Sequence, residues 1–449
     1  MGKKFRPYQP EQALLLPPNL HDWVPEGHLS HFVSDVVDSL DLKPIMSVYE
    51  AGDGRGYPPH DPRMMVKLLV YAYCTGKPSS RKIERATWED VAFRLLSGDQ
   101  HPDHVGIANF RKRHLKALGD LFEQVLRICC QAGLVKLGNV AIDGTKVKAN
   151  ASRHKAMSYG RMVDTERDLK KQIVELLARA QRADDDDDAR LGKGRRDDEL
   201  PAELHRRESR LKKIQEAKAA LEAQAKAKAD AMQPDVDARR AARAQRPGPK
   251  RGQKIKDPPR DPEAKAQRNF TDPDSRIMLD GATKSFVQAY NVQAAVDEHA
   301  QIIVATEVVQ TAPDQGQLAP MVAAVRAAVG APARVLADAG YYSEAAVLDP
   351  RCHGIELFIP PQRIRRDDQV APPCRPERPT AVEMRRKLAT PEGRAFYKRR
   401  KAIVEPVFGQ VKEARGFRRF SLRGHANVRS EWRLIAATHN LLKLFRATQ

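Results

Sequence analysis

Two aspartates follow short apolar stretches, and each stands one or two positions before a glycine. Asp143 ends the sequence Val-Ala-Ile-Asp and Asp338 ends Val-Leu-Ala-Asp, with Gly144 and Gly340 behind them. A carboxylate that leaves the carboxyl end of a buried strand lies where open α/β sheets bind their ligands. Glycine allows a backbone or a metal-bound substrate to approach closely. The pattern predicts two carboxylates at one edge of a sheet.

A third acid is sought in the helical sequence that follows the last predicted strand. The candidates are Glu392, Glu405 and Glu413. Glu405 has apolar neighbours on both sides, and Lys412 lies seven residues further on, two helical turns away. We therefore choose Glu405 and expect it to be buried against the sheet, with Glu413 as a surface charge paired to an arginine. Pro406 predicts a kink or a helix start near Glu405.

Three carboxylates of this kind would form an oxygen-rich cage. Mg²⁺ suits such a cage, because it binds few protein carboxylates together with water and phosphate oxygens. Two ions about 3.5–4 Å apart can activate a nucleophile and stabilise the leaving oxygen of an in-line phosphoryl displacement. We therefore predict Asp143, Asp338 and Glu405 as catalytic residues and as ligands of two Mg²⁺ ions. Each aspartate taken alone has the alternative of a turn or capping residue.

The strands that would carry these acids alternate with helical sequence. Predicted strands are Val140–Val147, Ser285–Ala295, Gln301–Val309, Ala333–Asp338 and Ile355–Ile359, and predicted helices are Gln315–Val329, Ser343–Leu348 and the sequence from Thr390 onward. Asp297 falls in the turn between the second and third strands. The order is strand, insert, hairpin, helix, strand, helix, strand, helix. This order predicts an α/β fold with a mixed sheet flanked by helices.

Residues 1–137 are expected to form an all-α N-terminal domain. Pro62 is well placed to start one helix, and Ser79 and Asp103 can cap two others. The helix that follows Asp103 is basic and contains Arg111 and Arg113. A series of short helices ending in a basic one resembles a helix-turn-helix DNA-binding arrangement. The alternative, a helical scaffold with a solvated charged face, stays open.

A segment of different composition separates the first strand from the hairpin. Apolar residues recur at helical spacing before and after the run Asp184–Asp188, and the later set, which includes Ile214 and Leu221, follows a heptad-like seam. This pattern predicts a helical, coiled-coil hairpin with the aspartates in a solvated loop at its tip, followed by a basic linker around Pro247–Gly252. The expected domains are residues 1–137, 138–154 for the first core strand, 155–270 for the insertion, and 271–449 for the rest of the core.

The charge balance indicates a polyanionic partner. The 449 residues carry a formal net charge of +20, with an isoelectric point near 9.8. Neutralisation of phosphates with release of counterions is the main source of nucleic-acid affinity. The five cysteines have no metal-type spacing and are typical of reduced thiols. Without a long apolar run or an apolar signal core, we expect a cytoplasmic protein with no membrane partner.

Three blocks of the sequence resemble the catalytic blocks of bacterial insertion-sequence transposases of the DDE class. They are Ala141-Ile142-Asp143-Gly144-Thr145, Ala337-Asp338-Ala339-Gly340-Tyr341-Tyr342 and Tyr397-Lys398-Arg399-Arg400-Lys401-Ala402-Ile403-Val404-Glu405-Pro406-Val407-Phe408-Gly409, continued through Lys412. Asp61-Pro62-Arg63 and Asn109-Phe110-Arg111-Lys112-Arg113-His114 are similar to pieces of the helical domain that precedes that core. Tyr397 and Arg400 lie one position further from Glu405 than in the strictest form of the motif.

This resemblance implies an RNase H-like catalytic core that depends on Mg²⁺, with Mn²⁺ able to substitute. Water and then a DNA 3′-hydroxyl would be the nucleophiles, and terminal inverted repeats and target DNA would be the double-stranded DNA partners. A homodimer in a synaptic complex, acting at the bacterial nucleoid, would hold the two ends. Candidate DNA contacts are Lys412, Arg400, Tyr397, Lys146, Arg111 and Arg113.

Two alternatives remain beside a transposase that cuts and joins DNA. One is an RNase H-like nuclease without strand transfer, and the other is a non-catalytic DNA-binding protein derived from a transposase. Tyr341 and Tyr342 have two interpretations as well, stacking on a displaced base or packing in the core.

Overall fold

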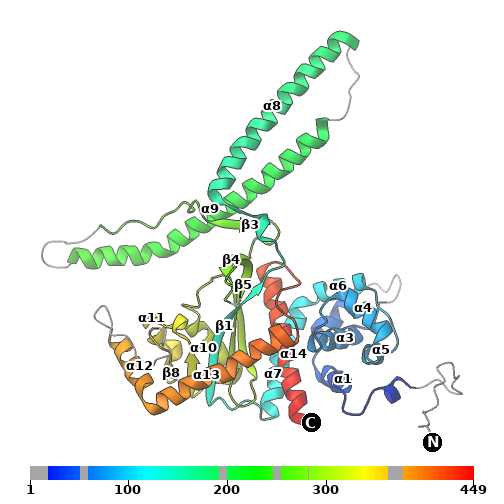
Figure 1. Cartoon of the computed structure of the whole chain (residues 1–449), viewed down its shortest axis with the longest axis vertical. Helices are drawn as coiled ribbons and strands as arrows, with labels where there is room; N and C mark the ends of the chain where they lie inside the picture. Colours follow the sequence, from blue (N-terminus) through cyan, green and yellow to red (C-terminus); the bar gives the residue numbers. More distant parts are fainter. Residues whose placement is uncertain (1–18, 51–58, 192–199, 246–253, 282, 363–377) are drawn as a thin grey trace, which may run out of the picture. The chain divides into compact units, whose positions relative to one another are not determined.

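The computed structural model describes residues 19–50, 59–191, 200–245, 254–281, 283–362 and 378–449 (Figure 1). The chain forms two compact units. Unit 1 contains the described residues up to Val147 together with 291–422 and 426–449, and unit 2 contains 148–290 and 423–425. The N-terminal helical region therefore belongs to the same unit as most of the sheet, while the predicted insertion falls within unit 2. The basic linker around Pro247–Gly252 lies largely outside the described residues.

A mixed sheet carries the two predicted aspartates. Its strands are β1 (Asn139–Lys148), β4 (Arg276–Leu279), β5 (Phe286–Asp297), β6 (Ile303–Val309), β7 (Arg334–Ala337) and β8 (Glu356–Phe358). They follow the order β4-β5-β1-β7-β8, with β6 paired to β5. The β1–β7 and β7–β8 pairs are parallel, whereas β4–β5 and β5–β6 are antiparallel. The predicted hairpin followed by strand–helix–strand units is confirmed.

The turn between β5 and β6 is tied back to the start of β1. The buried carboxylate of Asp297 accepts hydrogen bonds from the backbone N–H groups of Leu137 (2.8 Å) and His299 (2.9 Å). Asp297 is therefore the last residue of β5 and accepts a hydrogen bond from the turn that follows it, whereas the sequence predicted it inside that turn. Helix α10 (Leu318–Val329) connects β6 to β7, and the short α11 (Glu344–Val347) lies between β7 and β8.

The N-terminal part of unit 1 is all-α. Its helices are α1 (Leu29–Ser39), α2 (Lys43–Glu50), α3 (Pro62–Cys74), α4 (Ser80–Glu89), α5 (Val91–Ser97), α6 (His104–Arg113) and α7 (Leu115–Gln131). Asp61 and Asp103 cap α3 and α6 through their side chains. Ser79 precedes α4 but makes no capping hydrogen bond with its side chain. No helix in the described part of the chain combines the length and apolar character that a membrane crossing needs.

The N-terminal helices share a core with the C-terminal helix α14 (His425–Thr448). A Cβ at Gly119 of α7 would lie 3.1 Å from the backbone of Ser430, so α7 and α14 approach closely there. Further along, the rings of Phe32 and Phe445 lie 5.3 Å apart. These contacts join the two ends of the chain within unit 1.

Three further elements complete the C-terminal part, namely α12 (Pro379–Ala389), α13 (Pro391–Gly409) and the π-helical segment η5 (Gln410–Ala414). Helix α13 continues through Pro406, so of the two predicted alternatives, a kink or a helix start near Glu405, the helix start is wrong. Proline has no N–H to donate to the carbonyl four residues earlier. Here the Gln301 side chain donates to that carbonyl, on Ala402, at 2.9 Å. A hydrogen bond from the β5–β6 turn thus replaces the one that Pro406 removes.

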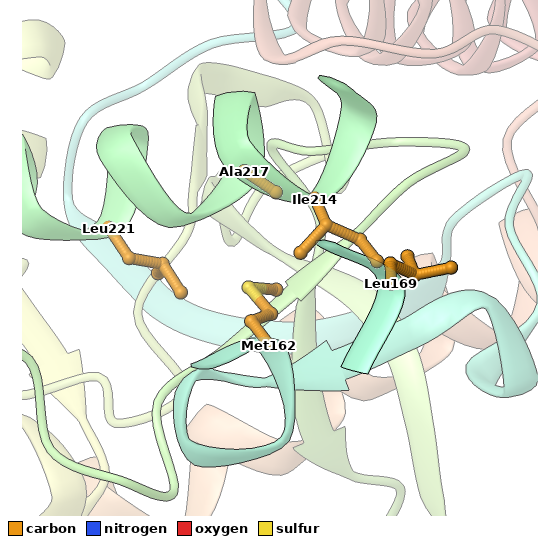
Figure 2. Packing of buried hydrophobic residues seen from close by; sticks show 5 residues of the cluster. All are labelled: Met162, Leu169, Ile214, Ala217 and Leu221. Carbon is orange, nitrogen blue, oxygen red and sulfur yellow. The ribbon is translucent and has the colours of Figure 1, made fainter. Parts of the chain in front are cut away.

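Unit 2 contains a helical hairpin built on a small sheet. Strands β2 (Ala156–Ser158) and β3 (Gln267–Asn269) pair antiparallel, and the long helices are α8 (Tyr159–Leu191) and α9 (Leu200–Gln245). Met162 and Leu169 of α8 pack against three buried residues of α9, Ile214, Ala217 and Leu221 (Figure 2). The predicted seam is therefore buried near the base of the hairpin. Asp184–Asp188 lie inside α8, so the prediction of a loop there is wrong.

Candidate active site

The parallel ladder between β1 and β7 ends immediately before both predicted acids. Its last pair is Ile142 with Ala337, so Asp143 and Asp338 follow at the same level of the sheet. Neighbouring strands lie about 4.8 Å apart, which places the two carboxyl groups within reach of one cation. Strand β7 ends at Ala337, whereas β1 continues to Lys148. Asp143 therefore lies directly after the parallel ladder but within β1, in agreement with the predicted strand Val140–Val147.

Asp143 is a largely buried carboxyl group with acidic neighbours. Burial raises its pKa to about 6, and the Asp338 and Asp314 carboxylates act in the same direction. The Arg400 guanidinium and the N–H of Gly144 oppose that rise. Such an arrangement disfavours the anion unless a cation is present.

Arg400 supplies a cation from helix α13. Its Nη1 donates to Oδ2 of Asp143 at 2.9 Å, and its Nη2 lies 4.0 Å from Oε1 of Glu405. The Arg400 side chain is 10% exposed. With about 100° of rotation per helical residue, Arg400 falls on the same face as the buried Ile403 and Val404. The guanidinium therefore stands between the first and third predicted acids.

Glu405 does not occupy the buried position predicted for it. Its side chain is 55% exposed. Its neighbours Val404 and Val407 are buried, but Glu405 itself points to another side of the helix. The other two candidates are also exposed. Glu413 pairs with Arg418, as expected for a surface charge.

Lys412 and Lys146 add cations around β1. Lys412 belongs to the π-helical segment η5, a geometry common at functional sites. Its Nζ donates to Oγ1 of Thr145, two residues after Asp143, at 2.7 Å. The Nζ of Lys146 lies 3.6 Å from Oδ1 of Asp314. Lys412 thus contacts the residue two positions after the first acid, and Lys146 lies three positions after it.

A polar network beneath the site was missed in the sequence. Asp314, in the segment between β6 and α10, accepts hydrogen bonds from Asn291 (2.7 Å) and Gln293 (2.8 Å), neighbouring inward positions of β5. Tyr341 is fully buried and donates its hydroxyl to the Gln293 side chain. A Cβ on Gly144 would lie 2.5 Å from Asp314 Oδ1, so only glycine fits there. The signal was the repeat of polar residues at alternate positions of an apolar strand.

The remaining predicted contacts lie in different settings. Tyr397 is half-buried on α13 beside Arg400, and burial raises its pKa. Tyr341 belongs to the core rather than to a base-stacking surface. Arg111 is buried and donates to the carbonyl of Pro78 at 2.5 Å, so its guanidinium has an internal partner. Arg113 is exposed.

The carboxylate oxygens at the site are the kind of donor that a hard divalent cation prefers, but the three predicted acids do not converge on one point. Among the described residues, no three His, Cys, Asp or Glu side chains converge on a point that would hold a metal ion. Asp143 and Asp338 are adjacent oxygen donors, and like-charge repulsion between them would be relieved by a cation. They therefore fit Mg²⁺ in donor type. Of the three predicted ligands, Glu405 is the one that does not lie beside the other two.

The ion pair between Arg400 and Asp143 leads to a prediction about the pKa of the Asp143 carboxyl. In EDTA-treated protein, we expect the Asp143 carboxyl to titrate near pH 6, above the range of an ordinary aspartate. Arg400→Met is expected to raise that pKa further, because the nearest cation stabilising the anion is lost. Carbon NMR of the aspartate carboxyls across a pH series measures both. Arg399→Met, which removes an exposed neighbour paired with Glu298, is the matched control. An Asp143 carboxyl that titrates near pH 4 would contradict the raised pKa predicted for it.

Two protein-family models match parts of the chain. Residues 18–113 match a transposase domain (DUF772), and residues 365–445 match a transposase DDE domain. The second match contains Arg400, Glu405 and Lys412, whereas Asp143 and Asp338 lie outside both matches. No curated protein and no solved structure matches the chain.

Proposed function

We propose that this chain, two parts of which match transposase family models, is an insertion-sequence DDE transposase. It would cut DNA at the ends of its element and join the freed 3′-hydroxyl to target DNA. The observation that carries this proposal is the adjacent pair Asp143 and Asp338 at the end of the parallel ladder, with Arg400 beside it. The parallel strands β1, β7 and β8 next to the β5–β6 hairpin support an RNase H-like core.

Three carboxylates would hold the metal that this chemistry needs. Asp143, Asp338 and Glu405 would bind two Mg²⁺ ions, with Mn²⁺ as a substitute. Bound there, the ions would supply Lewis-acid stabilisation of the attacking and leaving oxygens. Asp143 binds a cation as the anion, and its pKa of about 6 leaves it ionised at neutral pH.

The basic residues around β1 would position the DNA backbone. A guanidinium binds phosphate through two parallel N–H groups, so Arg400 is suited to a phosphate beside Asp143. Lys412 is held over β1 by its bond to Thr145 and offers a second cation. Lys146 and Tyr397 would line the same strand of DNA. Arg113 stays a surface candidate on α6, and the buried Arg111 is left out of the proposed interface.

Two DNA ends must be brought together before they can be joined to one target. We therefore propose that the active form is a homodimer holding the terminal inverted repeats. Its double-stranded DNA partners would be the element ends and the target.

A strand-joining experiment separates this proposal from its alternatives. The purified chain is incubated with Mg²⁺, a labelled duplex carrying one end of its own element, and an unlabelled supercoiled plasmid. We expect a nicked end and a labelled plasmid product, both abolished by EDTA. A duplex with a scrambled end is the matched control. Cutting without a joined product would indicate a nuclease, and binding without cutting would indicate a non-catalytic DNA-binding protein.

A further inference from the structure

A hollow of about 510 Å³ lies at the base of the helical hairpin in unit 2. It is lined by residues of β2 and the turn before it, the first turn of α8, one face of α9, and the segment after β3. Five of the lining side chains are basic or histidine, and none is acidic: His154, Lys155, Arg161, Arg210 and Lys213. All five are exposed to solvent. The hollow is therefore a concentrated, accessible positive surface.

One acid of the same hairpin, Glu166, is engaged by lysines that do not line the hollow. Glu166 binds both Lys170 (2.8 Å) and Lys218 (2.9 Å), and these contacts hold its pKa at about 2. Within the described residues, no ion pair joins an acid to any of these five lining side chains. A cluster of exposed like charges without acidic partners is unfavourable by itself and attracts anions.

The floor of the hollow is packed. Ile214 is 2% exposed and belongs to the buried cluster shared by α8 and α9 (Figure 2). Met157 and Phe270, which also line the hollow, pack against that cluster. Arg210 and Lys213 are three residues apart on α9 and so project from neighbouring positions of one face. The basic side chains thus extend from elements that pack on a buried apolar cluster.

We propose that this hollow binds the sugar-phosphate backbone of double-stranded DNA, as a contact separate from the active site. The proposal rests on the proposed function for its choice of DNA as the polyanion. Several exposed cations spread across a shallow surface match a line of phosphates better than a single small anion. Because phosphates are the same in every DNA sequence, a contact to the backbone adds affinity without sequence preference.

The test compares two double variants of the full chain. Arg210→Ala with Lys213→Ala removes two cations of the hollow. Lys226→Ala with Lys228→Ala removes two exposed lysines of the same helix, about 20 Å further along at 1.5 Å per residue. Both variants change the net charge by the same amount. Circular dichroism checks that each retains its helices.

Binding of a fluorescent 30-base-pair duplex is measured from 50 to 200 mM salt. We expect the hollow variant to bind about tenfold more weakly, with a salt dependence of log affinity reduced by about 2, one for each lost phosphate contact. The control variant should match the wild type.

Equal affinity and salt dependence in the wild type and the hollow variant, or an equal loss in both variants, would overturn the inference while leaving the proposed function intact. Stronger binding of an RNA duplex than of DNA would also overturn it. A wild-type chain that binds no duplex would instead contradict the proposed function.

Discussion

Asp143→Asn is expected to lower the rate of DNA cutting by about a thousandfold or more, without weakening DNA binding. The amide keeps the size of the side chain but loses the charge that a divalent cation requires. Metal stabilisation of a phosphoryl-transfer transition state amounts to several kcal/mol, and each 1.36 kcal/mol is a factor of ten in rate. Asp338→Asn should behave alike, since the two carboxyls lie at the same level of the sheet. Single-turnover cutting of labelled element ends, beside a binding titration, measures both quantities.

The third acid has a matched control in its own chain. Glu405→Gln is expected to reduce cutting as strongly as Asp143→Asn, whereas Glu413→Gln, at another exposed position of the same region, should leave the rate unchanged. If Glu405→Gln retained full activity, the assignment of the third ligand would be wrong. That outcome would direct attention to Asp314, the other acid close enough to influence Asp143.

The sequence predicted the positions of Asp143 and Asp338 in the sheet, because those positions depend on local rules. An apolar run that ends in an acid and glycine marks the end of a parallel ladder, and the register places Asp143 and Asp338 level with each other. The succession of strands and helices followed from the same alternation of apolar stretches. Capping of α6 by Asp103 was also predictable, because the cap and its helix are adjacent in the chain.

The predictions failed where a side chain's environment depends on distant segments. Apolar neighbours suggested a buried Glu405, but those neighbours mark the face that packs on the protein, and Glu405 lies outside it. Pro406 suggested a kink or a helix start, but the helix continues through it and a glutamine from the β5–β6 turn supplies the missing hydrogen bond. Asp314 is joined to Asn291 and Gln293 across more than twenty residues. The pattern of residues within a single segment cannot predict these hydrogen bonds.

Gly144→Ala is expected to be the most disruptive small substitution in the site. A methyl group there would lie 2.5 Å from Oδ1 of Asp314 and 2.5 Å from Nε2 of Gln293. Neither atom can yield cheaply, because the two are hydrogen-bonded to each other at 2.8 Å and Asp314 also accepts from Asn291. Overpacking of this kind costs about 1–3 kcal/mol, and we expect the upper part of that range because a polar network must break.

Gly138→Ala is the matched control, since Gly138 directly precedes the same strand and a Cβ there meets no atom within 4 Å. We expect Gly144→Ala to lower the melting temperature by about 5 °C, and Gly138→Ala to leave it near the wild-type value. Cutting should fall with Gly144→Ala even below its melting temperature, because displacement of Gly144 moves the adjacent Asp143 relative to Asp338. Equal melting temperatures and equal cutting rates in the two variants would show that Asp314 and Gln293 do not pack on Gly144. In that case the position of Asp143 would depend on the β1–β7 ladder and Arg400 alone.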